Sequence, residues 1–130
     1  MKLPGELRYT KSHEWVRKES DGTFAIGITD HAQEQLGDIV FVEAPKDGTK
    51  VAAGDSVGVV ESVKAVSDIY APVTGTVIEV NEDLPESPET VNEDPYGDGW
   101  LIKVKIADMT DLEDLMDNEE YAELLAREKE

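Results

Sequence analysis

The sequence predicts a small, mainly β domain, a sandwich or flattened barrel, with helices at its C-terminal end. Many short runs alternate apolar and polar residues, with Val and Ile prominent, as in strands that are half buried. The connections between these runs are short, as antiparallel pairing requires. From Thr110 onward the apolar residues recur at helical spacing. We expect one domain over residues 1–130, with a β-rich part at 7–106 and helices within 110–128.

The first part of the chain predicts a strand and then a hairpin. Residues 7–9 are expected to form a short strand, and residues 13–18 (HEWVRK) and 23–28 (TFAIGI) read as two further strands. The link between them, residues 19–22, ends in Asp-Gly, which is a strong turn signal. We therefore expect the second and third runs to pair as an antiparallel hairpin.

A short helix is expected at residues 29–36, because Thr29 or Asp30 can cap its first turn. Gly37 is a plausible residue to end it. The next run, residues 38–44 (DIVFVEA), alternates enough to predict a strand.

The C-terminal half predicts two more strands and two helices. Residues 76–80 and 100–106 read as strands, and the proline-rich, acidic segment 81–95 reads as a surface loop with one helical turn. Thr110 fits the N-cap of a first helix and Asn118 the N-cap of a second. The apolar residues expected to face inward in the second helix are Tyr121, Leu124 and Leu125.

The most informative stretch runs from Gly54 to Gly75, GDSVGVVESVKAVSDIYAPVTG, with Lys64 near its middle. The arms on either side predict two strands joined at a tip that presents the lysine. We expect the outer glycines to lie where the chain turns back with positive φ. Val63 and Lys64 are a poor pair for a tight hairpin turn, which favours Asn-Gly or Asp-Gly. A turn that departs from these preferences at a loop tip indicates a functional lysine. The alternative is a surface lysine that is simply solvated.

Charge and cysteine content restrict the function. The chain has 30 acidic and 12 basic residues, a net charge of −18, which disfavours nucleic acid and anionic membranes as partners. It suits docking onto basic protein surfaces, although the acidic residues could serve solubility alone. With no cysteine, disulfides, Cys-ligated zinc and iron–sulfur sites are excluded. His13 and His31 are too few for a His-rich metal site, so we expect no metal.

Targeting signals are not evident. No apolar run approaches the ~20 residues of a membrane-spanning helix. The N-terminal MKLPGELRY has neither the apolar region of a signal peptide nor the Arg- and Ser-rich composition of a transit peptide. We expect a cytoplasmic protein of a prokaryote, or the mature form of a mitochondrial one.

Four segments together resemble the glycine cleavage system H protein family, a family of lipoyl carriers. They are YTKSHEWV (9–16), GITDHAQEQLGDIVFVE (27–43), ESVKAVSDIYAPVTG (61–75) and SPETVNEDPYGDGWLIK (87–103). They cover most of the chain in the family's order, and the third is similar to its lipoyl-lysine segment. Val63 and Ala65 flank Lys64 where biotinyl hairpins typically carry Met, which favours lipoyl.

The resemblance implies a barrel-sandwich hybrid of the lipoyl/biotinyl type, with Lys64 at a hairpin tip. It implies a non-catalytic carrier in which lipoate is joined to Lys64 as an amide. The implied partners are a pyridoxal-phosphate-dependent glycine decarboxylase, a tetrahydrofolate-dependent aminomethyltransferase, dihydrolipoyl dehydrogenase and a lipoate-attaching enzyme. We expect a monomer.

The resemblance also suggests roles for residues near the lysine. Glu61 is expected to help the lipoate-attaching enzyme to recognise the hairpin, with solubility as the alternative. Glu14, Ser67 and Asp68 are expected to line a cleft that shelters the loaded arm, by pairing with its ammonium group. The alternative is turn chemistry for Ser67 and Asp68 and strand-edge solubility for Glu14.

Other functions stay open at this point. A carrier could instead relay lipoate to other proteins, or the chain could be an unmodified acidic adaptor. An enzyme with Lys64 as a Schiff-base nucleophile is disfavoured, because Glu61, Asp68 and an exposed tip would not lower the pKa of a lysine. We expect His31 at the surface, and we expect four aromatic residues in the core. These are Trp15, Phe24, Phe41 and Trp100.

Overall fold

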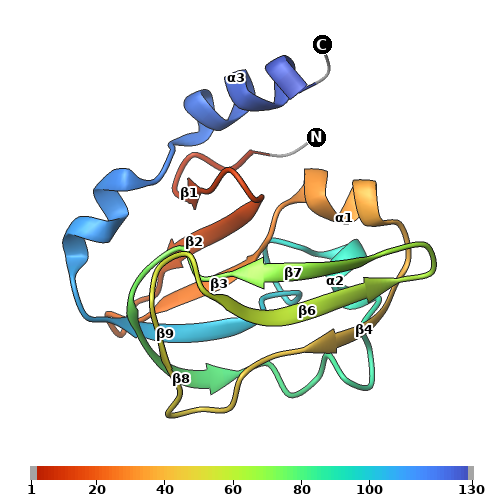
Figure 1. The fold of residues 1–130 in the computed structure, drawn as a ribbon, viewed down its shortest axis with the longest axis horizontal. Helices are drawn as coiled ribbons and strands as arrows, with labels where there is room; N and C mark the ends of the chain where they lie inside the picture. The colour runs from red at the N-terminus through yellow and green to blue at the C-terminus, as the bar shows by residue number, and fades with distance from the viewer. Residues whose placement is uncertain (1–2, 129–130) are drawn as a thin grey trace.

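The computed structural model describes residues 3–128 and shows two antiparallel sheets with helices at their margins (Figure 1). One sheet has six strands in the order β1-β2-β3-β9-β8-β5, and the other has three in the order β4-β6-β7. The strands are β1 (Arg8–Tyr9), β2 (Glu14–Lys18), β3 (Phe24–Ile28), β4 (Ile39–Glu43), β5 (Lys50–Val51), β6 (Ser56–Ser62), β7 (Val66–Tyr70), β8 (Gly75–Val80) and β9 (Ile102–Ile106). The helices are α1 (Asp30–Leu36), α2 (Thr90–Glu93), the 3₁₀ helix η1 (Met109–Asp114) and α3 (Asn118–Glu128). The expected β-rich architecture with C-terminal helices is confirmed, and the sheets do not close into a barrel.

The β2–β3 hairpin forms as the Asp-Gly signal predicts. Glu14 pairs with Ile28 at one end of the register and Lys18 with Phe24 at the other. Gly22 has a φ of 86°, a left-handed conformation that side chains disfavour, so glycine is required at this turn.

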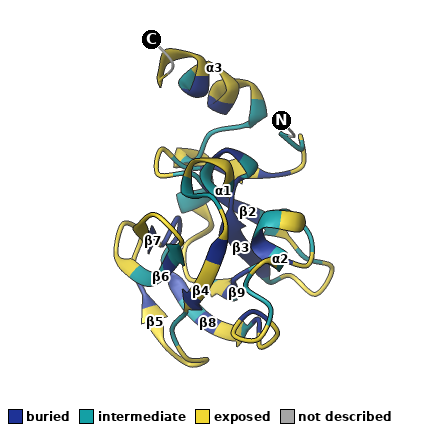
Figure 2. Cartoon of the chain, turned by 90° about the vertical axis from the view of Figure 1, so that its right-hand side faces the viewer, coloured by how far each residue is buried: buried dark blue, intermediate teal, exposed yellow. Residues whose placement is uncertain are grey.

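The apolar core lies against the inner faces of both sheets and under α3. Figure 2 shows buried residues along β2 and β3, whereas the outward side of α3 is exposed. Trp15 and Phe24 are buried as expected, and Trp100 is half buried with the Lys103 ammonium over its ring. Tyr121 and Leu125 of α3 pack against the N-terminal strands, so this helix completes a separate cluster of the core.

The expectation that Phe41 is a core residue is wrong. Phe41 is 44% exposed, and its neighbour Val40 is 52% exposed. The pairing of β4 with β6 shifts register between Ile39 and Phe41, which is where a β-bulge or irregularity interrupts the ladder. Two consecutive residues therefore face solvent, and simple alternation fails at this point.

The helix α1 begins and ends where the sequence predicts. Thr29 is its N-cap, and the Thr29 hydroxyl accepts a hydrogen bond from the backbone N–H of Ala32. Gly37 ends the helix with a φ of 82°, and its N–H donates to the carbonyl of Gln33. The expectation that His31 is a surface residue is wrong. It is 9% exposed, because the His13 ring lies 4.7 Å from its ring and a Glu128 oxygen of α3 lies 3.7 Å from its Nε2.

The first C-terminal helix differs from its prediction. It is the 3₁₀ helix η1, and its cap is Asp108 rather than Thr110. The Asp108 carboxylate accepts hydrogen bonds from both the N–H and the hydroxyl of Thr110, at 2.9 and 2.6 Å. An Asp two residues upstream therefore outcompetes the threonine as the cap.

The second C-terminal helix, α3, is capped one residue before Asn118. Asp117 accepts from the N–H of Glu120 at 2.8 Å, and the Glu120 carboxylate accepts from the N–H of Asp117 at 3.1 Å. This reciprocal pair is a capping box. Tyr121 and Leu125 face inward as predicted. Among residues 3–128, no helix has the length and apolar character needed to cross a membrane.

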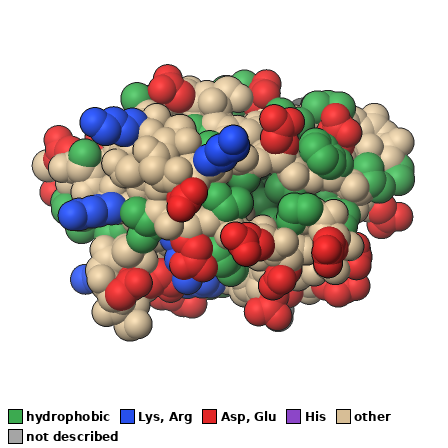
Figure 3. Space-filling view, turned by 90° about the horizontal axis from the view of Figure 1, so that it is seen from below, with side chains coloured by type: hydrophobic (Ala, Val, Ile, Leu, Met, Phe, Trp, Pro, Cys, Tyr) green, Lys and Arg blue, Asp and Glu red, His purple; other side chains and the backbone are tan. Residues whose placement is uncertain are grey.

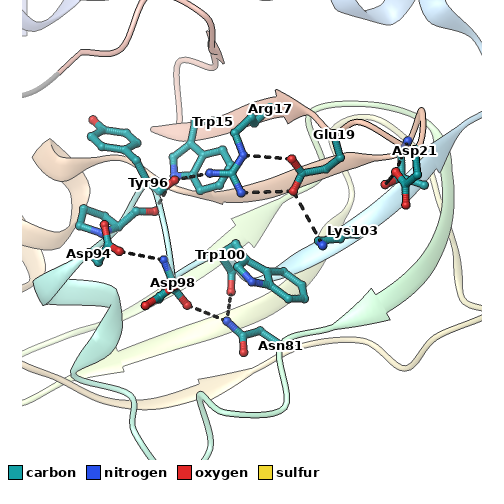
Figure 4. A network of polar contacts seen from close by, with 12 residues as sticks. Trp15, Arg17, Glu19, Asp21, Asn81, Asp94, Tyr96, Asp98, Trp100 and Lys103 are labelled. Atoms are coloured by element: carbon teal, nitrogen blue, oxygen red, sulfur yellow. Dashed lines mark hydrogen bonds and ion pairs between the residues drawn. The ribbon is translucent and has the colours of Figure 1, made fainter.

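The loop between β8 and β9 is ordered by side-chain hydrogen bonds to its backbone (Figure 4). The Asn81 amide donates to the carbonyls of Asp98 and Trp100 at 2.9 and 2.7 Å. The Trp15 indole donates to the carbonyl of Pro95 at 3.0 Å. The expected surface loop with one helical turn, α2, is confirmed.

Candidate functional site

The β6–β7 hairpin projects past the rest of its sheet (Figure 1). Residues 62–65 form the turn, and Lys64 is exposed at its tip. The predicted placement of Lys64 at a hairpin tip is confirmed. A primary amine in this position is accessible to an enzyme that acylates it.

The tip turn is closed by the side chain of Ser62. The N–H of Ser62 donates to the carbonyl of Ala65 at 2.8 Å, as in an ordinary hairpin. The Ser62 hydroxyl accepts from the N–H groups of Ala65 and Lys64, at 3.0 and 3.2 Å. Neither Val63 nor Lys64 has a positive φ, so this turn needs no glycine. Val-Lys is not a favoured pair for a tight turn, and the Ser62 hydroxyl supplies the hydrogen bonds that close this turn.

The tip also rests on the junction between α1 and β4. The N–H of Val63 donates to the carbonyl of Asp38 at 3.1 Å. The stem of Lys64 lies over Gly37, where a Cβ would come 3.4 Å from its Cε. Gly37 thus ends the helix and leaves room for the lysine stem.

This junction is in turn held by Asn92 of α2. The Asn92 side chain accepts from the N–H of Ile39 at 2.8 Å. It donates to the carbonyl of Gly37 and to the side-chain oxygen of Gln33, both at 2.9 Å. The lysine tip therefore sits on a base that is fixed by a residue far away in sequence.

The glycines that bound the hairpin stretch have different roles. Gly54 has a φ of 91° and supplies the expected left-handed turn. The expectation for Gly75 is wrong, because it is the first residue of β8 and has no positive φ. A Cβ there would lie 2.3 Å from the carbonyl oxygen of Lys105, so Gly75 allows close approach of β9.

Glu14 is a buried carboxylate that joins β2 to the edge of β7. It is 2% exposed, and it accepts hydrogen bonds from the hydroxyls of Thr10 and Ser12. Its other oxygen accepts from the N–H of Tyr70 at 3.3 Å. Burial raises the pKa of Glu14, while these hydrogen bonds act in the opposite direction. A role in strand-edge solubility is therefore wrong for Glu14.

Ser67 and Asp68 are exposed neighbours on β7, and their side chains leave the strand on opposite faces. Asp68 accepts a hydrogen bond from the hydroxyl of Ser56 at 3.2 Å. Within residues 3–128, no hydrogen bond joins Glu14 to either residue. The structure brings Glu14 to the same strand through Tyr70, and the sheltering role of the three stays a prediction.

The outer face of the hairpin near the tip exposes apolar side chains around Glu61. Glu61 on β6 pairs with Phe41 on one side and Val66 on the other. Phe41, Val66 and Val63 are 44%, 67% and 70% exposed. Exposed apolar residues grouped in this way are typical of a contact surface for a partner.

Comparisons with known proteins give one consistent family. A family model described as glycine cleavage H-protein matches residues 7–128. The chain is 60% identical over 119 residues to the glycine cleavage system H protein of Idiomarina loihiensis, with 92% of each chain covered. It is 64% identical over 115 residues to that of Vibrio cholerae, covering 88% of this chain and 91% of the relative. The crystal structure of a glycine cleavage system H protein from Mycobacterium marinum superposes with a TM-score of 0.87 at 42% identity, covering 95% of this chain and 99% of that one.

Proposed function

This chain belongs to the glycine cleavage H-protein family, and from that premise we propose that Lys64 carries one covalently attached lipoyl group. The family's members are lipoyl carriers of the glycine cleavage system and are not themselves catalysts. One observation carries the assignment to this residue. Lys64 is exposed at a projecting hairpin tip whose turn is closed by Ser62 and supported by the α1–β4 junction.

The residues around Lys64 suit a lipoyl amide. The amine is at the tip of the hairpin, where an attaching enzyme can reach it, and the amide would remove one positive charge. The chain has no cysteine, so the reactive sulfur of the system must come from the cofactor. Lys64 would hold the lipoyl group, whose disulfide would supply the redox and aminomethyl-carrying chemistry shared with a pyridoxal-phosphate-dependent glycine decarboxylase, a tetrahydrofolate-dependent aminomethyltransferase and dihydrolipoyl dehydrogenase.

The protein's own contribution is to fix the root of the arm. Ser62 holds the turn, the Asp38 carbonyl holds Val63, and Gly37 supports the lysine stem. A fixed root with a free distal end keeps the reactive group at high effective concentration near each docked partner. The hairpin therefore holds the attachment point in place, and the movement between partner enzymes comes from the lipoyl-lysine arm.

Partner docking is expected to use the acidic surface. Figure 3 shows Asp and Glu side chains spread over one face of the molecule, with apolar side chains grouped between them. A net charge of −18 favours encounter with basic surfaces on the partner enzymes. Glu61, with the exposed Phe41 and Val66 beside it, is the surface that we assign to the lipoate-attaching enzyme.

Glu14, Ser67 and Asp68 are proposed to shelter the loaded arm. Support comes from Glu14, a carboxylate that is 2% exposed and bonded to the edge of β7, the strand that carries the other two. Loss of ammonia from the loaded carrier measures this role. We expect faster loss for Glu14→Gln and Asp68→Ala than for the unaltered chain. Equal rates would refute the sheltering role without touching the carrier function.

Glycine–bicarbonate exchange by the decarboxylase tests the carrier function itself. We expect exchange to depend on the lipoylated chain and to be lost with Lys64→Arg. The unlipoylated chain is the matched control for docking without the arm. If the fully lipoylated chain supported no exchange with an active decarboxylase, the proposed function would be wrong.

A further inference from the structure

Two histidines and a glutamate from three separate segments meet at one place. His13 precedes β2, His31 lies in the first turn of α1, and Glu128 ends α3. The Nε2 of His13 is 3.4 Å from one Glu128 oxygen, and the Nε2 of His31 is 3.7 Å from the other. One ligand atom from each of the three residues lies within 4.8 Å of the others.

The cluster is partly built before any ion arrives. The side chains of His31 and His13 are 11% and 19% exposed, whereas Glu128 is 40% exposed and leaves an entrance. The Nδ1 of His13 is 2.8 Å from the hydroxyl of Tyr121, which is itself 2.7 Å from the hydroxyl of Thr29. This contact orients the imidazole and leaves Nε2 toward Glu128, the arrangement of an outer partner behind a metal-ligating histidine.

We propose that His13, His31 and Glu128 bind a divalent transition-metal ion, with Zn²⁺ as the ion they fit best. Two imidazoles and one carboxylate are a known ligand set for zinc, with a water at the fourth position. Bonds of about 2.0–2.1 Å in a tetrahedron place ligand atoms about 3.3 Å apart. Each histidine Nε2 lies about this far from one of the two Glu128 oxygens, and a set with one atom from each residue lies within 4.8 Å, so the three side chains would close slightly around an ion. Imidazole ligands disfavour Mg²⁺ and Ca²⁺. Two histidines alone are too few for a metal site, but Glu128 of α3 adds a third ligand.

The metal site is separate from the lysine tip. His31 begins α1, whereas Lys64 rests on Gly37 beyond its other end, so about 9 Å of helix axis lies between them at ~1.5 Å per residue. A bound ion would link α3 to α1 and to the segment before β2. It would therefore stabilise the docking of the C-terminal helix, independently of any lipoyl group.

Zinc titration calorimetry of the full, unlipoylated chain tests the proposal. The unlipoylated form is used because a dithiol arm would bind zinc by itself. Excess Mg²⁺ in the buffer occupies the many surface carboxylates. We expect one Zn²⁺ per chain, with at least tenfold weaker binding for Glu128→Gln and for His31→Asn. Glu123→Gln, an exposed glutamate on the same helix with the same loss of charge, should bind zinc as the unaltered chain does.

Two further readouts make the result decisive. Co²⁺ bound in place of Zn²⁺ should give the visible absorption of a tetrahedral site, and this absorption should be lost with Glu128→Gln. Because Glu128 is an exposed residue at a helix end, its variant should fold even if His31→Asn does not. The proposal is overturned if zinc shows no binding with one-to-one stoichiometry, or if Glu128→Gln binds it no more weakly than Glu123→Gln.

Discussion

The loops that present Lys46 and Lys64 are built in different ways. In the β4–β5 loop, Lys46 precedes Gly48, which has a φ of 86° and donates to the carbonyl of Val77 at 2.6 Å. In the β6–β7 turn, Lys64 has no glycine beside it, and the Ser62 hydroxyl closes the turn. The first loop follows the usual turn preferences, with a glycine at its left-handed position. The second departs from them and is closed by a side chain instead, which indicates that the lysine, rather than the turn, is the required feature.

The largest contrast is expected in lipoylation itself. Lys64→Arg should abolish attachment of lipoate by the attaching enzyme, because a guanidinium does not replace the acylated amine. Lys46→Arg should be lipoylated like the unaltered chain. Both are surface substitutions, so thermal unfolding should change little, within about 0.5 kcal/mol. Lipoylation of Lys64→Arg at another lysine would remove the distinction between the two loops.

The next contrast concerns the support beneath the tip. Asn92→Ala and Asn81→Ala each remove an amide that makes three hydrogen bonds. We expect each to lower the free energy of unfolding by about 2–3 kcal/mol, measured by urea denaturation. Only Asn92→Ala should also slow lipoylation, because only Asn92 holds the junction under Lys64. Equal lipoylation rates for the two variants would show that the support does not matter.

The smallest contrast compares the two turns directly. Gly48→Ala should cost about 1–2 kcal/mol, from its left-handed backbone alone, without affecting lipoylation. Ser62→Ala should cost under about 1 kcal/mol, because the freed N–H groups are exposed to water. It should nevertheless speed hydrogen exchange at the Lys64 and Ala65 amides and slow lipoylation. If Ser62→Ala leaves both rates unchanged, the hydroxyl does not hold the tip.

Features set by neighbouring residues were predictable from the sequence. The Thr29 cap, the Gly37 helix end and the Asp-Gly turn all depend on short-range preferences, and all are found. The Val- and Ile-rich arms on either side of Lys64 predicted its position at a hairpin tip, and the structure has it there. The serine that closes this turn was predictable in principle, since Ser side chains favour such turns.

Features set by distant contacts were not predictable. His31 is covered by His13 and by Glu128, which lies nearly a hundred residues later in the chain, so its own helix alone indicates a surface position. Phe41 is exposed by a register shift that alternation cannot reveal. The supports of the site, from Asn92 to the α1–β4 junction and from Glu14 to Tyr70, likewise join distant segments. One error had a local cause: Asp108 and Thr110 can both cap the first C-terminal helix, and Asp108 is the cap in the structure.

The most direct test is the intact mass of the protein from its native host, followed by peptide mapping. We expect one lipoyl-sized increment per chain, located on Lys64 and absent from Lys46. An unmodified Lys64, in cells that have both lipoate and the attaching enzyme, would contradict it. So would an increment that maps to any other lysine.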